Sequence, residues 1–73
     1  MLEFDFSKLQ GRIIEKFGTR SAFAAAWGVA DSFLSSRLNN KVYFDTPEIY
    51  EICELLDIQA EEIPVYFFTV KVL

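Results

Sequence analysis

Apolar residues recur at helical spacing along most of the chain, which predicts a mainly α-helical fold. Within residues 8–17, Leu9, Ile13 and Phe17 lie four apart and therefore share one face of a helix, for which Ser7 is the expected N-cap. The same kind of pattern predicts four further helices, over residues 20–27, 31–39, 47–56 and 60–67.

Capping residues mark the ends of several of these helices. Thr19 is a good N-cap for the second helix, and Thr46 followed by Pro47 is a strong start signal for the fourth. Gly18 and Gly28 stand where the first and second helices end, as expected for a residue that adopts left-handed backbone without strain. Because 73 residues leave no room for a second domain, we expect the whole chain to form one compact domain of five helices.

Both ends of the chain have an extended pattern. Residues 2–6 alternate strictly between apolar and acidic. Residues 68–73 are rich in apolar and β-branched residues, which predicts a terminal strand. Phe68, Val70 and Val72 alternate with polar residues along this strand, so they are candidates for a protein interface. The strand pairs either with residues 2–6 of its own chain or with its twin across a two-fold axis. We favour the second arrangement, which predicts a homodimer.

Composition narrows the classes of function. Cys53 is the single cysteine and histidine is absent, so neither an intramolecular disulfide nor a zinc site is expected. The sequence has no nucleophile–base pair and no glycine-rich phosphate loop, which argues against an enzyme, a cofactor or a small-molecule substrate. It has neither the pattern of a signal peptide nor the apolar stretch of roughly 20 residues that a membrane helix needs. We therefore expect a cytoplasmic protein without catalytic activity.

Charge is unevenly distributed along the chain. The net charge is −4, which by itself argues against nucleic acid. Residues 8–41 nevertheless carry six basic and two acidic residues, whereas all seven charges in residues 45–62 are negative. A binding surface explains this division better than the overall sum does. The basic residues of the first half are Lys8, Arg12, Lys16, Arg20, Arg37 and Lys41.

Residues 19–39 have the spacing of a helix-turn-helix. Ala24 is the small residue that lets the next helix cross at close range, and Gly28 permits left-handed backbone at the tight turn. Leu34 and Leu38 are placed to hold the second helix of the pair against the rest of the domain. Each match is weak alone, but the complete spacing inside a five-helix pattern is a strong signal.

The third helix has a short, polar and uncharged outward face. With about 100° between successive residues, the side opposite Leu34 and Leu38 carries Ser32, Ser35, Ser36 and Asn39. Short hydroxyl and amide side chains reach base edges in the major groove without holding the backbone away. We therefore predict that these four residues read DNA bases, while the six basic residues of the first half contact phosphates.

With these features the chain resembles the small Cro/repressor-type, or lambda repressor-like, helix-turn-helix proteins of temperate phages. The resemblance rests on residues 6–18, 38–42 and 55–64, and it extends over about residues 4–68. It implies a five-helix fold and binding of double-stranded operator DNA as a dimer. It also implies a role in the choice between lysis and lysogeny in a bacterial host.

The resemblance also assigns roles to single residues near the turn. It implies that Ser32 and Ser36 read bases and that Arg20 and Lys41 contact phosphates. Asp31 stands at the start of the third helix, where it either caps the helix N-terminus or accepts a hydrogen bond from cytosine. Capping is the interpretation we favour, because a carboxylate beside phosphates is mostly repulsive.

Aromatic residues around the helix-turn-helix leave several roles open. Trp27 is expected in the core beside Phe23, one helical turn earlier. Phe33 lies on the flank of the outward face, where it touches a thymine methyl, packs against the first helix, or marks a protein interface. Tyr43 and Phe44 either wedge against the fourth helix, which we favour, or stack on a sugar.

Two functional hypotheses follow from these residues. The first is a Cro-like phage transcriptional regulator that binds operator DNA through its helix-turn-helix. The alternative is an anti-repressor, or modulator, that uses the same fold to bind a partner phage repressor. The acidic net charge, the lack of Arg or Gln at the start of the third helix, and Phe33 support this alternative. A phage structural domain is a third interpretation, for which the sequence offers no positive signal.

Overall fold

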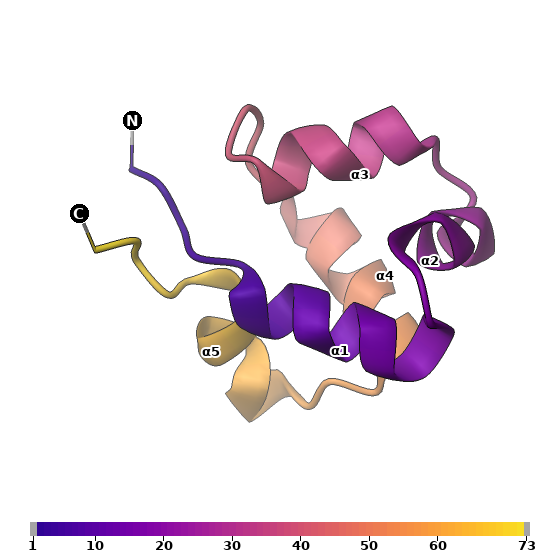
Figure 1. Cartoon of the computed structure of the whole chain (residues 1–73). Coiled ribbons are helices and arrows are strands. Elements are labelled where there is room, and N and C mark those ends of the chain that lie inside the picture. The colour runs from indigo at the N-terminus through magenta and orange to yellow at the C-terminus, as the bar shows by residue number, and fades with distance from the viewer. Residues whose placement is uncertain (1, 73) are drawn as a thin grey trace.

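Across residues 2–72, which the computed structural model describes, the chain forms five α-helices and one 3-10 helix. These are α1 (Ser7–Phe17), α2 (Arg20–Trp27), α3 (Asp31–Leu38), α4 (Thr46–Leu56), η1 (the 3-10 helix, Ala60–Glu62) and α5 (Ile63–Phe67). α2 lies at one end of the molecule and α5 lies with both chain termini at the other, while α3 runs between these two ends (Figure 1). The predicted five-helix fold is confirmed.

The turn between α2 and α3 is built as the sequence predicts. Thr19 is the N-cap of α2, and its Oγ1 accepts a hydrogen bond from the Ala22 N–H at 3.0 Å. Gly28 ends α2 with a φ of 85°, in the left-handed region that favours glycine. Beyond it, the Val29 N–H donates to the Ala24 carbonyl at 3.0 Å. This bond closes the turn and directs the chain into α3.

The predicted N-caps of α1 and α4 are each wrong by one residue, because the structure has Phe6 and Asp45 at these positions. Ser7 lies inside α1, and its N–H donates to the side chain of Asp5 at 2.8 Å. Thr46 likewise lies inside α4, whose N-cap is Asp45. The Asp45 carboxylate accepts from the Glu48 N–H at 2.9 Å, and Glu48 accepts from the Asp45 N–H at 3.1 Å. This reciprocal pair satisfies two backbone donors, which a threonine at the next position would not do.

The core draws residues from all five α-helices. Phe23 of α2 lies at its centre and packs edge-on against Phe17 of α1, with ring centroids 5.3 Å apart. Phe44 packs edge-on against Phe6 and against Phe67 of α5, so the wedge against the fourth helix stays a prediction, while Trp27 is only half-buried at the edge of the core. The buried residues are Phe6, Leu9, Ile13, Phe23, Ala24, Leu34, Leu38, Ile52, Leu56, Ile58 and Phe67.

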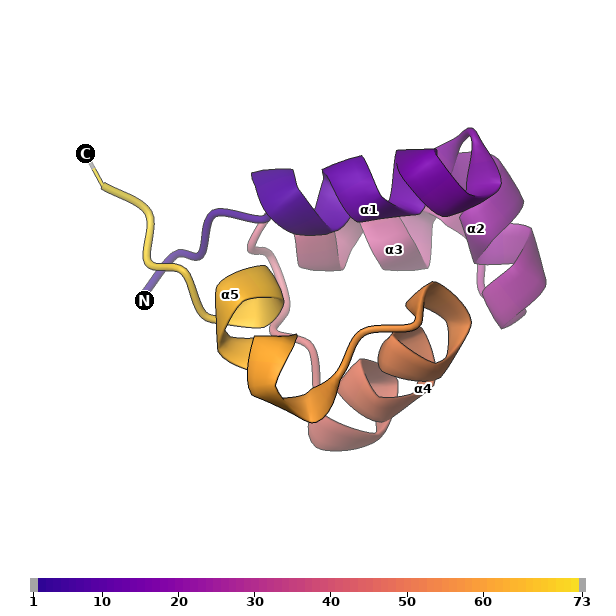
Figure 2. The same ribbon diagram turned by 90° about the horizontal axis from the view of Figure 1, so that it is seen from below.

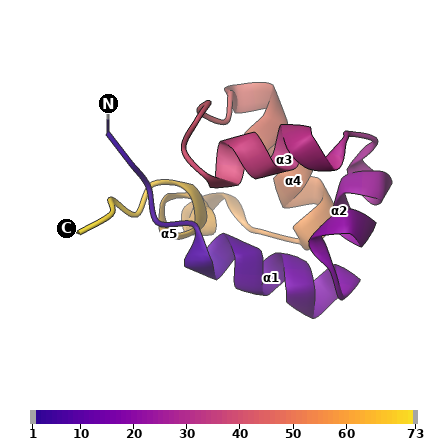
Figure 3. The ribbon, with the colours of Figure 1, turned by 45° about the horizontal axis from the view of Figure 1, so that its top comes forward.

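The two ends of the chain lie side by side (Figure 3). Phe4 and Val70 form an isolated antiparallel bridge, flanked by a 2.7 Å hydrogen bond from the Asp5 N–H to the Thr69 carbonyl. The predicted terminal strand over residues 68–73 is therefore wrong: within residues 2–72 only this bridge forms, because the N-terminal partner soon enters α1. Its pairing partner belongs to the same chain, which is the alternative we did not favour. Leu73 lies outside the described residues, and a homodimer stays a prediction.

Asn40 fixes the N-terminal segment to the loop that follows α3. Its side-chain amide donates to the Phe4 carbonyl at 2.9 Å and accepts from the Phe4 N–H at 2.8 Å. Asn40 itself has a φ of 63°, a left-handed conformation that asparagine tolerates better than most residues. Nearby, the Tyr43 hydroxyl donates to the Leu2 carbonyl at 2.8 Å. The loop after α3 and the chain termini thus form one connected end of the molecule.

Cys53 is half-buried on α4, where desolvation and the charges of Glu54 and Glu62 raise the pKa of its thiol. Among residues 2–72, no group of three or more His, Cys, Asp or Glu side chains is placed to hold a metal ion. Within the same part of the chain, no helix has the length and apolar character needed to cross a membrane.

Candidate functional site

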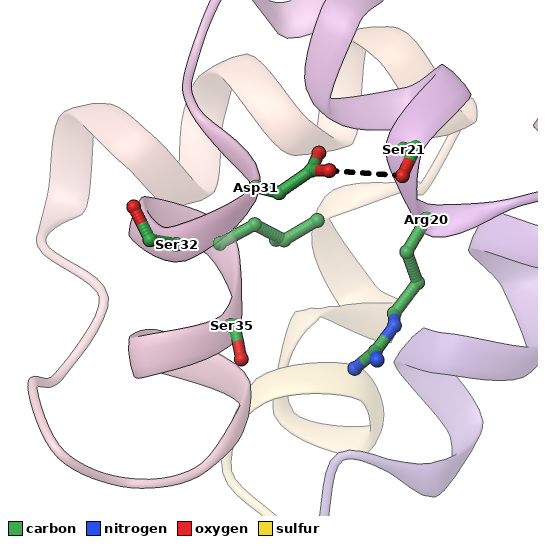
Figure 4. Close-up of a pocket in the computed structure, with 6 residues that line it drawn as sticks. Arg20, Ser21, Asp31, Ser32 and Ser35 are labelled. Carbon is green, nitrogen blue, oxygen red and sulfur yellow. Dashed lines mark hydrogen bonds between the residues drawn. The ribbon is translucent and has the colours of Figure 1, made fainter.

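The outward face of α3 is arranged as the helical wheel predicts. Leu34 and Leu38 are buried, Ser32 is exposed, and Ser35 is half-buried. Arg20 from the start of α2 faces this side of α3 across a shallow pocket of about 340 Å³ (Figure 4). The pocket lies between the N-terminal turns of α2 and α3, where a helix-turn-helix protein would approach DNA.

Three of the four predicted base-reading residues already have hydrogen-bond partners within α3. The Asn39 side-chain amide donates to the Ser35 hydroxyl at 3.1 Å, and the Ser36 hydroxyl donates to the Phe33 carbonyl at 3.3 Å. Among residues 2–72, Ser32 forms no hydrogen bond through its side chain. Ser32 is therefore the member of the predicted set whose hydroxyl is most available to a partner.

Asp31 does not cap α3, which is the role we favoured, and its hydrogen bond with cytosine stays a prediction. The N-cap of α3 is Ala30, which forms no side-chain cap, and Asp31 is the first residue inside the helix. Its carboxylate accepts a hydrogen bond from the Ser21 hydroxyl at 3.0 Å, which ties the start of α3 to α2 (Figure 4). A carboxylate is thereby held in the same pocket as Arg20, where it opposes the binding of phosphate.

Arg37 is largely enclosed by its own chain. Its Nε and Nη2 donate to the two carboxylate oxygens of Glu48 on α4, both at 3.2 Å. The guanidinium also lies over the ring of Phe33, 3.6 Å from the ring centroid. The side chains of Arg37 and Glu48 are only 15% and 13% exposed. To contact a phosphate, Arg37 would first have to leave this carboxylate.

Two of the three predicted phosphate-contacting residues of α1 are paired with carboxylates, and the third lies over an aromatic ring. Arg12 donates from Nε to the Leu56 carbonyl at 2.9 Å and from Nη1 to Glu15 at 2.6 Å. Lys16 pairs with Asp57 just after α4, and this ion pair lowers the pKa of the Asp57 carboxyl. Lys8 lies over the ring of Tyr66, with its Nζ 5.9 Å from the centroid.

Arg20 and Lys41 complete the set of six. Among residues 2–72, neither forms an ion pair, and both are exposed. Arg20 stands at the start of α2, whereas Lys41 stands in the loop after α3, so the two cations flank α3 from its opposite ends (Figure 1). Lys8 is exposed as well and has no carboxylate partner, so among residues 2–72 three of the six predicted phosphate-contacting cations form no ion pair.

Comparison with known proteins identifies the family. A model of the family described as "Protein of unknown function (DUF739)" matches residues 2–70. The chain belongs to the DUF739 family. It is also similar to the modulator of repression (MOR) of the temperate bacteriophage TP901-1 from Lactococcus lactis, whose solution structure superposes with a TM-score of 0.83. The two chains are 40% identical, and the alignment covers 96% of this chain and 95% of that one. No curated protein matches.

The candidate interface residues of this DUF739 chain fall into two separate places. Phe33 packs edge-on against Trp27 of α2, with centroids 5.6 Å apart, and does not lie against α1 as one prediction had it. Phe68, Val70 and Val72 are exposed at the opposite end of the molecule, beside the N-terminus. The structure therefore does not bring the four residues into one surface.

The acids of the DUF739 chain take part in a network that the sequence analysis missed. Glu48 holds Arg37, Asp57 holds Lys16, and Glu51 accepts a hydrogen bond from the Trp27 indole N–H at 2.7 Å. One local signal was present, because Asp45 followed three residues later by Glu48 is the pattern of a capping box. The partners of Asp57 and Glu51 come from distant parts of the chain and had no local signal.

Proposed function

We propose that this DUF739 protein is a modulator that binds a phage repressor protein, and that it does not itself read operator DNA. The similarity to a phage modulator of repression, at 40% identity over nearly the full length of both chains, supports this proposal. The observation that carries it is the state of the six basic residues on which DNA binding would depend. Three of them, Arg12, Lys16 and Arg37, are paired with carboxylates of the same chain.

The loss of free cations has a measurable consequence for DNA binding. Each phosphate contact contributes about −0.9 to the slope of log affinity against log salt. Six contacts would give a slope of about −5, whereas Lys8, Arg20 and Lys41 alone would give about −3. The carboxylate of Asp31 beside Arg20 weakens even this remainder. Three cations on three different segments of the chain are a poor basis for the nonspecific attraction that precedes sequence recognition.

The reading helix also lacks strong base contacts. Arg to guanine and Gln or Asn to adenine are the pairings that discriminate bases by two parallel hydrogen bonds. The single Arg of α3 is bound to Glu48, and the Asn39 amide donates to Ser35. Ser32 alone offers a free hydroxyl. A base edge or a protein group can form a hydrogen bond with it. These contacts favour a protein partner over a specific DNA sequence.

Two titrations on the purified chain test this proposal. Isothermal titration calorimetry with the repressor encoded beside the gene for this chain should give saturable one-to-one binding at micromolar concentration or tighter. Fluorescence anisotropy with a labelled operator duplex should give weak binding with a shallow salt slope, and no preference over a scrambled duplex. Tight, sequence-preferring DNA binding without any repressor binding would overturn the proposal in favour of the Cro-like regulator.

A further inference from the structure

A second concave surface lies away from α3, between α4 and the segment that leads into α5. The chain leaves α4 and turns back toward α5 in Figure 2, and the resulting groove has a volume of about 530 Å³. Its floor and walls include Ile49, Cys53 and Ile63, and its rim includes Tyr50, Glu54 and Asp57. An apolar floor with charged edges is the general form of a groove that receives an amphipathic helix.

The charged side chains that line the groove, Glu54 and Asp57, are both acidic. Among residues 2–72, no Lys or Arg side chain lines it. The carboxylates of Glu54 and Glu62 lie close enough to Cys53 to raise the pKa of its thiol, in addition to the effect of burial. Lys16 compensates the charge of Asp57 at one end of the groove. The remaining carboxylates face solvent, so a partner that enters the groove gains from carrying positive charge.

Tyr50 supplies an aromatic contact on the rim. Tyr50 is 65% exposed, which is more than the other exposed aromatic residues, Tyr43 and Phe68. A hydrogen bond with Glu54, together with that carboxylate's charge, raises the pKa of the Tyr50 hydroxyl. Tyrosine is enriched at the energetic centres of protein interfaces because it combines a large apolar ring with a polar tip. An exposed Tyr50 above an apolar floor fits such a contact.

We propose that this groove binds a cationic amphipathic helix of the partner repressor, with the apolar face of that helix on Ile49 and Ile63 and its Lys or Arg side chains toward Glu54. This inference rests on the proposed function. The charge of the groove argues against DNA as the occupant. A second copy of this chain is a poor occupant as well. The basic residues Arg12 and Lys16 of its helix α1 already form ion pairs within their own chain.

Nuclear magnetic resonance on the isotope-labelled chain, titrated with the unlabelled repressor, tests the location. We expect amide shift changes centred on residues 49–63 and little change on α3. Tyr50→Ala should weaken binding about tenfold, as expected for a central aromatic contact. Glu54→Gln should weaken it about threefold and reduce its dependence on salt, and Glu54→Arg should weaken it further. Both positions are exposed, so these variants should keep the thermal midpoint of the parent.

Two control variants carry matched changes outside the groove. Val65→Ala removes an exposed apolar side chain from α5, and Glu3→Gln removes an exposed carboxylate from the N-terminal segment. Both should bind the repressor as the parent does. If the shift changes centre on α3, and Tyr50→Ala and Glu54→Arg bind the repressor with parental affinity, then the groove is not the binding site. The proposed function would still stand. Absence of any shift change or calorimetric signal would overturn both.

Discussion

Replacing Arg37 by Met tests the contact that joins α3 to α4. The substitution removes the guanidinium but keeps an unbranched apolar stem that still packs on Phe33. In the folded chain the guanidinium makes two 3.2 Å hydrogen bonds to Glu48 and lies 3.6 Å from the Phe33 ring centroid. Both side chains of the ion pair are less than one-fifth exposed, at 15% and 13%. Water therefore screens this pair far less than it screens an ordinary surface ion pair.

The expected cost follows from what the substitution leaves behind. Removing one partner of a buried ion pair costs about 3–5 kcal/mol, because the other charge stays without compensation. Glu48 keeps the N–H of Asp45 as a donor at 3.1 Å, and its side chain retains some contact with water. We therefore expect Arg37→Met to lower the free energy of unfolding by about 2–3 kcal/mol.

Urea denaturation followed by circular dichroism measures this loss. Glu48→Gln completes a double-mutant cycle, because a glutamine oxygen still accepts from the Asp45 N–H and preserves the cap of α4. The two substitutions should couple by about 1–2 kcal/mol, so that the double variant is more stable than the sum of the single losses predicts. Arg37→Lys should recover only part of the stability, since an ammonium group does not bind both carboxylate oxygens in parallel.

The opposite result would identify Arg37 as a free surface cation. A loss below about 0.5 kcal/mol, without coupling to Glu48, would refute the argument from burial and geometry. If the same Arg37→Met variant also reduced the salt slope of DNA binding by about 0.9, Arg37 would be a phosphate contact, as the sequence first indicated.

Three further substitutions test the local structure. Asn40→Gly keeps the left-handed backbone but removes both side-chain bonds to Phe4, and it should cost about 1–3 kcal/mol in urea denaturation, with faster exchange of the Phe4 amide. In Gly28→Ala the added Cβ meets no neighbouring atom, but alanine is strained at a φ of 85°. This variant should therefore lower the free energy of unfolding by about 1–2 kcal/mol, and Gly28→Asn should lower it less. Asp57→Asn removes the bond to Lys16. Because that bond lowers the folded pKa of Asp57, its stabilisation is present above the unfolded pKa and is lost as pH falls through the folded value. The stability difference between parent and Asp57→Asn should therefore shrink on acidification.

The helix boundaries were predictable where they depend on one residue and its near neighbours. Thr19 has no competing cap beside it, and the structure uses it as predicted. Before α4, by contrast, Asp45 and Thr46 are adjacent and both are good N-caps. The choice depends on whether the residue three positions later can reach back, and Glu48 completes the capping box only with Asp45. A rule that scores residues one by one does not contain this reciprocal bond.

The outward face of α3 was also predictable, but its chemistry was not. The wheel placed Leu34 and Leu38 inside and Ser32 outside, as the structure has them. Phe33 stands one helical turn before Arg37, so the stacking of the guanidinium on that ring had a local signal. Glu48 belongs to another helix, and only the folded chain brings its carboxylate to Arg37. Which cations are free is therefore a property of the tertiary structure.

On our proposal that the chain does not read operator DNA, internal ion pairing accounts for a helix-turn-helix-like fold with low affinity for DNA. Along the sequence the basic half suggests a DNA-binding surface, but in the fold Arg37 and Lys16 each pair with an acid from the acidic half. Every such pair removes one positive charge from the surface that DNA would contact. Acids such as Glu54 and Glu61 remain exposed, and no Lys or Arg among residues 2–72 lines the groove beside Glu54. The surface that is left favours a basic protein partner, and the same ion pairs that disfavour DNA also hold the helices together.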